Sequence, residues 1–144
     1  MTTVTDDGAL VAASRREEAL YAGLVAVYQE LAAALADPTA PADPAWIGDR
    51  HAQAGATTAE LRALAAALGP RRLSAAPVPP AARAYWSRSA EFAAEAARLG
   101  ADLIALARGR QATLASAVAA ADARRVALDA YRPAATAERP RLTA

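Results

Sequence analysis

Hydrophobic residues in the first quarter of the chain recur with the spacing of an α-helix. Five of them follow one another at intervals of four, three, four and four residues, which places them on one helical face. These are Leu20, Leu24, Val27, Leu31 and Leu35. The pattern predicts a helix over residues 10–36, with Asp6 or Asp7 as its N-cap. Asp37-Pro38 predicts its end, because a proline disfavours helical geometry in the residue before it.

A second helical pattern follows a proline-rich connection over residues 37–45. Asp43 followed by Pro44 is typical of an N-cap and a first helical position, since proline fixes a helical φ and lacks an N–H that the first turn does not need. The apolar residues that share one face of this predicted helix are Ile47, Ala54, Leu61, Leu64 and Leu68.

Two short motifs bear on where this second helix begins and ends. Residues 57–60 match a capping box, so a restart of the helix after Gly55 is left open. Gly69-Pro70 predicts the end of the helix, because glycine favours a C-terminal cap and proline cannot continue the hydrogen-bond ladder. Residues 70–80 are therefore expected to form a second loop.

The last helical pattern is the longest and contains no proline over residues 81–131. Gly100 and Gly109 each cost about 1 kcal/mol relative to alanine in a helix interior, and a bend near Gly109 is one way to accommodate them. The apolar residues continue along one face with some drift; they are Tyr85, Phe92, Leu99, Leu103, Leu106, Leu114, Val118 and Leu128. The sequence predicts one helical domain over residues 1–133 and a disordered tail over residues 134–144.

The three patterns together predict an all-α protein, an antiparallel bundle of three long helices. Alternation typical of strands is not found, and alanine, the best helix former, supplies 47 of the 144 residues. Alanine buries little area, so that the core is expected to be thin. Large rings should then supply much of the buried surface as core anchors: Trp46, Trp86, Tyr21, Tyr28, Tyr85 and Phe92.

Charge and cysteine content exclude several classes of function. The 16 arginines nearly balance 15 acidic residues, which argues against a nucleic-acid surface, because such surfaces need clustered cations. The chain has no cysteine, so disulfides and thiolate metal sites are excluded. The N-terminus lacks the features of a signal peptide, and no run of about 20 apolar residues predicts a membrane span. The sequence predicts a cytoplasmic protein.

Candidate catalytic and metal-binding residues are few. His51 is the single histidine, and a polar residue near a helix start explains it better than a ligand or a base, because metal sites gather several ligands. Glu91 and Glu95 are four residues apart, but Arg88 and Arg98 lie three residues from them and favour an exposed charged stripe. No serine lies in a nucleophile elbow, and no glycine-rich phosphate loop occurs. The chain is predicted to be no enzyme, with no cofactor and no metal.

Paired arginines have two interpretations, as phosphate-binding groups or as solvated helix surface. The pairs are Arg15-Arg16, Arg71-Arg72, Arg108/Arg110 and Arg124-Arg125. Acidic residues interleave with most of them, and solvated helix surface is therefore the favoured interpretation.

The longest helix carries the candidate partner-binding surface. Two partner helices of about 25 residues are too short to cover the whole apolar stripe of a helix of about 50, so part of the stripe is expected to be exposed. Complete burial within the monomer remains the alternative. The residues predicted to bind a partner are Leu99, Leu103, Leu106, Gln111, Leu114 and Val118, with Ile104 beside them on the exposed face.

This organisation resembles the FlgN family of flagellar export chaperones. The resemblance is carried by a leucine-patterned helix at residues 16–31, a shorter helix ending in Leu-Arg-Ala-Leu-Ala-Ala-Ala-Leu, and a long helix whose residues 103–118 lead to Tyr131-Arg132-Pro133. The family resemblance implies a small cytoplasmic helical protein that holds hook-associated subunits before type III export. It places the partner-binding stripe on Leu103, Leu106, Gln111, Leu114 and Val118. This chain departs from the family in having only Gln111 as a central amide and in its longer proline-rich loops.

Two hypotheses therefore follow from the sequence. The first is a non-catalytic chaperone that offers an apolar stripe to an amphipathic segment of a protein client, without nucleic acid and without insertion into a membrane. The second is a self-associating structural protein in which the same stripe closes a homodimer. Both depend on a leucine face that stays accessible on the last helix.

Overall fold

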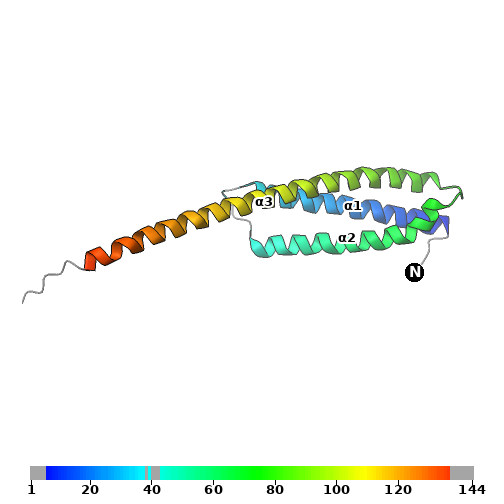
Figure 1. Ribbon diagram of the computed structural model, residues 1–144. Coiled ribbons are helices and arrows are strands. Elements are labelled where there is room, and N and C mark those ends of the chain that lie inside the picture. Colours follow the sequence, from blue (N-terminus) through cyan, green and yellow to red (C-terminus); the bar gives the residue numbers. More distant parts are fainter. Residues whose placement is uncertain (1–5, 38, 40–42, 137–144) are drawn as a thin grey trace, which may run out of the picture. The chain divides into compact units, whose positions relative to one another are not determined.

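The computed structural model describes residues 6–37, 39 and 43–136, with side-chain surroundings as far as Tyr131. It contains three helices, α1 (Asp7–Ala36), α2 (Pro44–Leu73) and α3 (Pro80–Thr136), and no strand within these residues (Figure 1). The all-α prediction is confirmed. The chain divides into two compact units, Met1–Leu106 and Ala107–Ala144, whereas the sequence predicted one domain over residues 1–133.

In the first unit, α1, α2 and the beginning of α3 lie side by side as the predicted bundle (Figure 1). Ion pairs join Arg16 to Glu60 and Glu30 to Arg50, so that residue numbers rise along α1 as they fall along α2. These two helices are therefore antiparallel. The α3 residues that contact α1 rise in step with it, and α1 and α3 run in the same direction, as in an up-down-up bundle.

The predicted starts of the first two helices are confirmed. Asp6 is the N-cap of α1, and its carboxylate accepts a hydrogen bond from the backbone N–H of Ala9 at 3.2 Å. Asp43 caps α2 in the same way, accepting from Ala45 N–H at 3.0 Å, with Pro44 at the first helical position. Both caps satisfy backbone donors that have no partner inside the helix.

The predicted end of the second helix at Gly69-Pro70 is wrong, because α2 continues through Pro70 to Leu73. A proline normally clashes with the Cβ of the preceding residue, and Gly69 has none. Arg71 in the last turn is also held in place: its Nη2 donates to Asp7 at 2.9 Å and to the carbonyl of Pro77 at 2.8 Å. The local sequence disfavours a helix in this last turn, and the contacts of Arg71 with Asp7 and Pro77 stabilise it.

The restart of this helix after Gly55 does not occur, since α2 is one uninterrupted helix. The hydroxyls of Thr57 and Thr58 donate to the carbonyls of Gln53 and Ala54, four residues earlier. This is the bonding of threonines inside a helix, whereas a capping box would use the hydroxyl as an acceptor for a free N–H.

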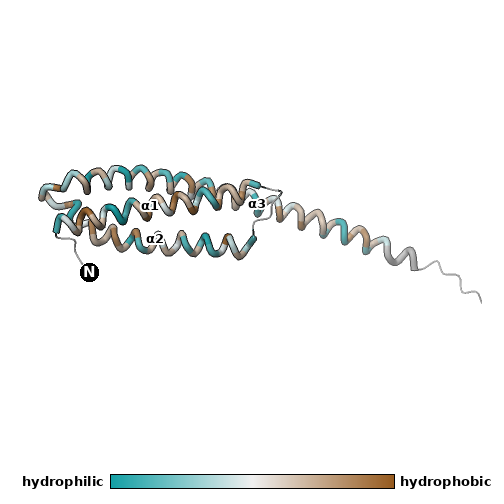
Figure 2. The backbone as a smooth tube through the Cα atoms, turned by 180° about the vertical axis from the view of Figure 1, so that it is seen from behind, coloured by the Kyte–Doolittle hydropathy of each residue, from teal (hydrophilic) through white to brown (hydrophobic). Residues whose placement is uncertain are grey.

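Two hydrophobic clusters hold the bundle together. The larger contains four of the five residues of the predicted α1 face, all except the half-buried Leu35, together with residues of α2 and α3, among them Leu61 and Leu99. The smaller contains Leu10, Leu68 and Ala82, each with 0% exposure. Four of the predicted anchors, Tyr21, Tyr28, Trp46 and Phe92, pack against the larger cluster, and Trp86 packs against the smaller one. Hydrophobic and hydrophilic residues alternate along each helix, as Figure 2 shows.

By length and composition alone, α1 could cross a membrane, which differs from the prediction that no segment could. The core helix of a bundle meets the same criteria. Eight residues of α1 are buried, and four of them are leucines that lie in the two clusters shared with α2 and α3. We therefore interpret the apolar character of α1 as that of a core helix.

The third helix is continuous over 57 residues and includes both Gly100 and Gly109. It extends beyond its predicted end at Tyr131 and includes residues 134–136, which were assigned to the disordered tail. The remainder of that tail, residues 137–144, lies outside the described residues. A bend near Gly109 stays a prediction.

Candidate functional site

The six predicted partner-binding residues do not share one environment. Leu99 is only 7% exposed and belongs to the larger core cluster, so its placement on an exposed face is wrong. Its spacing of seven residues from Phe92 and fourteen from Tyr85 keeps it on the side of α3 that packs within the bundle. Leu103 is half-buried against the same cluster, and Leu106 is also half-buried.

The other three predicted residues lie in the second unit and are exposed. They are Gln111, Leu114 and Val118, of which Leu114 is 64% and Val118 60% exposed. Ile104, at the end of the first unit, is 56% exposed. Of the six predicted residues, Leu99 is thus buried, Leu103 and Leu106 are half-buried, and the three from Gln111 onward are exposed.

The exposed apolar surface extends further along α3 than was predicted. Val126, Leu128 and Tyr131 are between 69% and 78% exposed. At about 100° per residue, four of the large side chains fall within one half of the helix circumference. We call these four residues, Leu114, Val118, Leu128 and Tyr131, the C-terminal stripe. The sequence contains a signal for this stripe, because Leu114 and Leu128 are fourteen residues apart, close to four full turns of a helix.

Small residues lie between the large ones on this face. Ala107 and Ala121 are each seven residues from Leu114, and Ala117 lies between Leu114 and Ala121 along the same side. Alanine at such positions lets the backbone of another helix approach closely, while the leucines supply the apolar contacts. The surface therefore has the features of one side of a helix–helix interface.

The balanced net charge of the chain conceals an uneven distribution. Residues 1–106 carry nine arginines and twelve acidic residues, whereas residues 107–131 carry four arginines and two aspartates. Two of those arginines, Arg124 and Arg125, lie in the sequence between Val118 and Leu128 of the C-terminal stripe. The exposed part of α3 is therefore basic, and the bundle is acidic.

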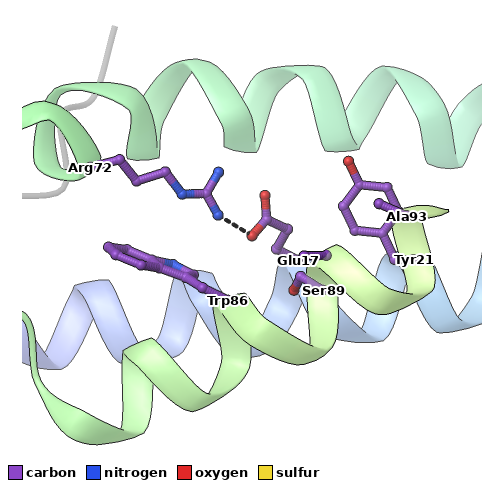
Figure 3. Close-up of a pocket in the computed structure, with 7 residues that line it drawn as sticks. Glu17, Tyr21, Arg72, Trp86, Ser89 and Ala93 are labelled. Carbon is purple, nitrogen blue, oxygen red and sulfur yellow. Dashed lines mark hydrogen bonds and ion pairs between the residues drawn. The ribbon is translucent and has the colours of Figure 1, made fainter.

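A second feature is a polar pocket among the three helices of the bundle (Figure 3). It has a volume of about 270 Å³ and is lined by Glu17, Tyr21, Arg72, Trp86, Ser89, Ala90 and Ala93. Glu17 comes from α1 and is only 3% exposed. Its carboxylate accepts a hydrogen bond from Nη2 of Arg72 on α2, drawn as the dashed line in Figure 3.

Arg72 also packs on an aromatic ring. The centre of its guanidinium lies 5.0 Å from the centroid of Trp86 on α3, within the range of a cation–π contact. The arginine pair Arg71-Arg72 was assigned to solvated helix surface; this is wrong for Arg71, whose side chain is 12% exposed, whereas Arg72 is exposed. Both side chains bind residues of α1, and a sequence pattern limited to one helix contains no signal for such partners.

Two hydrogen-bonding atoms of the pocket lack a protein partner. Nε1 of Trp86 and Oγ of Ser89 are buried and form no hydrogen bond with the described residues. A buried donor without a partner costs about 1–3 kcal/mol. Both atoms have almost no surface accessible to a water-sized probe, so they lie in the wall of the pocket and do not open into its space.

The remaining candidate residues lie on the surface. His51 is exposed on α2, and among the described residues no three histidine, aspartate or glutamate side chains lie close enough to hold a metal ion. Arg98 binds Glu95, as predicted, at 2.6 and 2.9 Å, and this hydrogen bond lowers the pKa of the Glu95 carboxyl. These groups form a charged helix surface.

The other predicted local pair is replaced by one between helices. Arg88 was expected to pair with Glu91 on its own helix, but it binds Glu18 of α1 through two hydrogen bonds, at 2.8 and 3.0 Å. These hydrogen bonds lower the pKa of the Glu18 carboxyl below its ordinary value. A two-point bond between planar groups fixes the relative position of the two helices better than a single contact does.

The C-terminal stripe and the polar pocket are the two candidate sites of this chain. The stripe has the chemistry of a protein-docking surface, and the pocket contains the ion pair between Glu17 of α1 and Arg72 of α2. No known family model, curated protein or solved structure matches this chain.

Proposed function

We propose that this chain is a non-catalytic protein-binding module that uses the C-terminal stripe of α3 to hold a helical segment of a client protein. The observation that carries the proposal is the exposure of Leu114, Val118, Leu128 and Tyr131, which is 60% or more at each. Burying a large aliphatic side chain fully is worth about 1.5–3 kcal/mol, and a stripe of two leucines, a valine and a tyrosine can offset the ordering of a partner segment.

The charge of the segment indicates the chemistry of the client. Four arginines and two aspartates over residues 107–131 favour a partner whose apolar face is flanked by carboxylates. A second copy in parallel register fits less well, since Arg124 would then face the Arg124 of the other copy. We therefore infer that the client segment is an acidic amphipathic helix.

The family resemblance extends the proposal. In the FlgN family of export chaperones the clients are hook-associated flagellar proteins, and the corresponding role here is a cytoplasmic chaperone that keeps such a subunit soluble before type III export. The resemblance rests on the length and pattern of the helices. The proposal of an acidic helical client rests on the stripe and its charges and does not require that family.

The test is a binding titration with a defined peptide. The full chain is titrated into a fluorescent 20-residue amphipathic peptide with leucines at helical spacing and glutamates on both flanks, and anisotropy is recorded. We expect saturable binding that Leu114→Asp weakens at least tenfold, because a carboxylate at the centre of the stripe repels the flanks and disrupts apolar burial. Ser116→Asp, which places the same charge on the opposite side of the helix, is the matched control and should bind like the unmodified chain.

A peptide with lysine in place of glutamate should bind more weakly and lose less affinity at high salt. Equal binding by the Leu114→Asp and Ser116→Asp variants would contradict the proposal. Sedimentation of the chain over a concentration series addresses the homodimer. A tight dimer that Leu114→Asp dissociates would favour self-association over client binding.

A further inference from the structure

Two arginines lie within the C-terminal stripe and not only beside it. Arg125 is eleven residues from Leu114, which makes three turns and about 20° of a helix, so both residues are on one side of α3. Arg124 falls about 80° from Leu114 in the other direction, between Leu128 and Tyr131. Both positions are inside the arc that the four residues of the stripe span. A partner helix that covers the stripe therefore also covers these two side chains.

The side chains of both arginines are unpaired among the described residues. Earlier on the same helix, Arg88 binds the carboxylate of Glu18 through two hydrogen bonds. Arg124 and Arg125 are exposed, and neither forms an ion pair with a described residue. Their charges therefore stay available to a partner molecule.

Covering an arginine determines which partner can bind. The aliphatic stem of Arg125 can lie along an apolar surface, but its guanidinium loses water when it is covered, and this loss is costly unless a carboxylate replaces the water. A wholly apolar client helix would leave the guanidinium covered and unpaired. A client with a carboxylate at that place would form a charge-assisted, two-point hydrogen bond with it. The arginine therefore favours the second client and disfavours the first.

Acidic residues restrict where that carboxylate can lie. Between residues 107 and 131 the chain has two of them, Asp122 and Asp129. They fall about 80° and 60° from Leu114, just beyond Val118 at one edge of the stripe. A carboxylate of the client is repelled at this edge and attracted over the arginines. The charge of the client is therefore expected within its apolar face.

We propose that Arg125 determines which client helices bind and in which register, by pairing with a carboxylate set within the apolar face of the client; this inference rests on the proposed function. Arg125 is seven residues after Val118 and three before Leu128, so the carboxylate lies about 10 Å along the helix axis from the client residue over Val118 and about 4.5 Å from that over Leu128. A client shifted by one turn places another residue over Arg125. Polar residues in the seam of a coiled coil fix its register in the same way.

Matched peptides test this role against apolar burial alone. A helical peptide carries leucines opposite the three aliphatic residues of the stripe, one glutamate opposite Arg125 and neutral residues elsewhere, and a second peptide has leucine in place of the glutamate. Both are made in forward and reversed sequence, to represent parallel and antiparallel clients, and are titrated with the full chain by fluorescence anisotropy. We expect the glutamate peptide of one direction to bind at least tenfold more tightly than its leucine counterpart, although the leucine peptide offers more apolar area.

Charge reversal separates a specific pair from general attraction. Arg125→Glu should weaken binding of the glutamate peptide at least tenfold, and a peptide with lysine at that position should regain it. Arg108→Glu makes the same charge change about 80° beyond Val118, outside the stripe, and should alter affinity by less than about threefold.

The outcomes distinguish this inference from the proposed function. Equal effects of Arg125→Glu and Arg108→Glu, or a leucine peptide that binds as tightly as the glutamate peptide, would overturn the role of Arg125. If Leu114→Asp still weakens binding in that case, the stripe remains the docking surface. If the unmodified chain binds none of the peptides, the proposed function and this inference are both overturned.

Discussion

The two compact units differ in the exposure of their leucines, which are buried in the bundle and exposed in the C-terminal segment. Leu24 and Leu61 of the bundle are each 6% exposed, whereas Leu114 and Leu128 of the C-terminal segment are 64% and 69% exposed. All four are leucines in regular helices. The difference lies in the neighbours: in the bundle, residues of three helices share one core, while the described residues 107–131 belong to one helix and none of them is buried.

Helix formation and apolar burial therefore have separate causes in this chain. Ten of the 25 residues from 107 to 131 are alanine, which favours a helix without any tertiary contact. In the bundle, packing of amphipathic faces supplies most of the stability. We therefore expect the same type of substitution to have different effects in the two units.

The largest difference is expected for leucine-to-alanine substitutions. Leu68→Ala removes a side chain with 0% exposure from the smaller cluster and should lower the free energy of unfolding by about 2–5 kcal/mol. Leu114→Ala removes the same atoms from an exposed site and should change it by no more than about 0.5 kcal/mol. Urea denaturation followed by circular dichroism measures both. Similar losses in the two variants would show that the stripe is already buried in solution.

A smaller difference is expected for two exposed glycines. A Cβ atom added at Gly23 or at Gly109 meets nothing within 4 Å, so alanine fits at both. Gly23→Ala should raise the free energy of unfolding of the bundle by about 0.5–1 kcal/mol. Gly109→Ala should instead slow amide hydrogen exchange around residue 109 and leave the bundle transition in place. An equal rise for both variants would indicate that the two units unfold as one.

The smallest effect concerns the ion pair between α1 and α3. Hydrogen bonds from Arg88 lower the pKa of Glu18 in the folded state, so the pair stabilises the bundle above the unfolded pKa of about 4.3. This contribution is lost as the pH falls through the lower folded pKa. Glu18→Gln should therefore be slightly less stable than the unmodified chain at pH 7, and the two should converge in acid. In an Arg88→Ala background the same substitution should lose most of its pH dependence, and an unchanged pH profile would contradict the assignment.

Much of the bundle could be predicted because its signals are local. The spacing of Leu20, Leu24, Val27 and Leu31 places them on one face, and all four are buried. Asp6 and Asp43 cap the helices that follow them, as the positions of the aspartates indicated. Predictions failed where a residue far away in the sequence determines the local structure or the ion pair. The helix continues through Pro70, and the next residue, Arg71, binds Asp7. Arg88 binds Glu18 rather than a neighbour on its own helix.

The candidate sites show the same division. Gln111, Leu114 and Val118 are exposed as expected, but no periodicity distinguishes them from Leu99, which continues the same pattern and is buried. The polar pocket had no sequence signal, because Glu17, Arg72 and Trp86 come from three helices.

The sequence by itself determined that this chain forms three helices, which faces of them are apolar and where the first two begin, since these properties depend on residues within a few positions of one another. Only the tertiary structure decided which apolar residues are covered and which charges meet. Burial and the ion pairs between helices depend on neighbours that are distant in the sequence: Arg16 and Glu60 are 44 residues apart, and Glu18 and Arg88 are 70 residues apart.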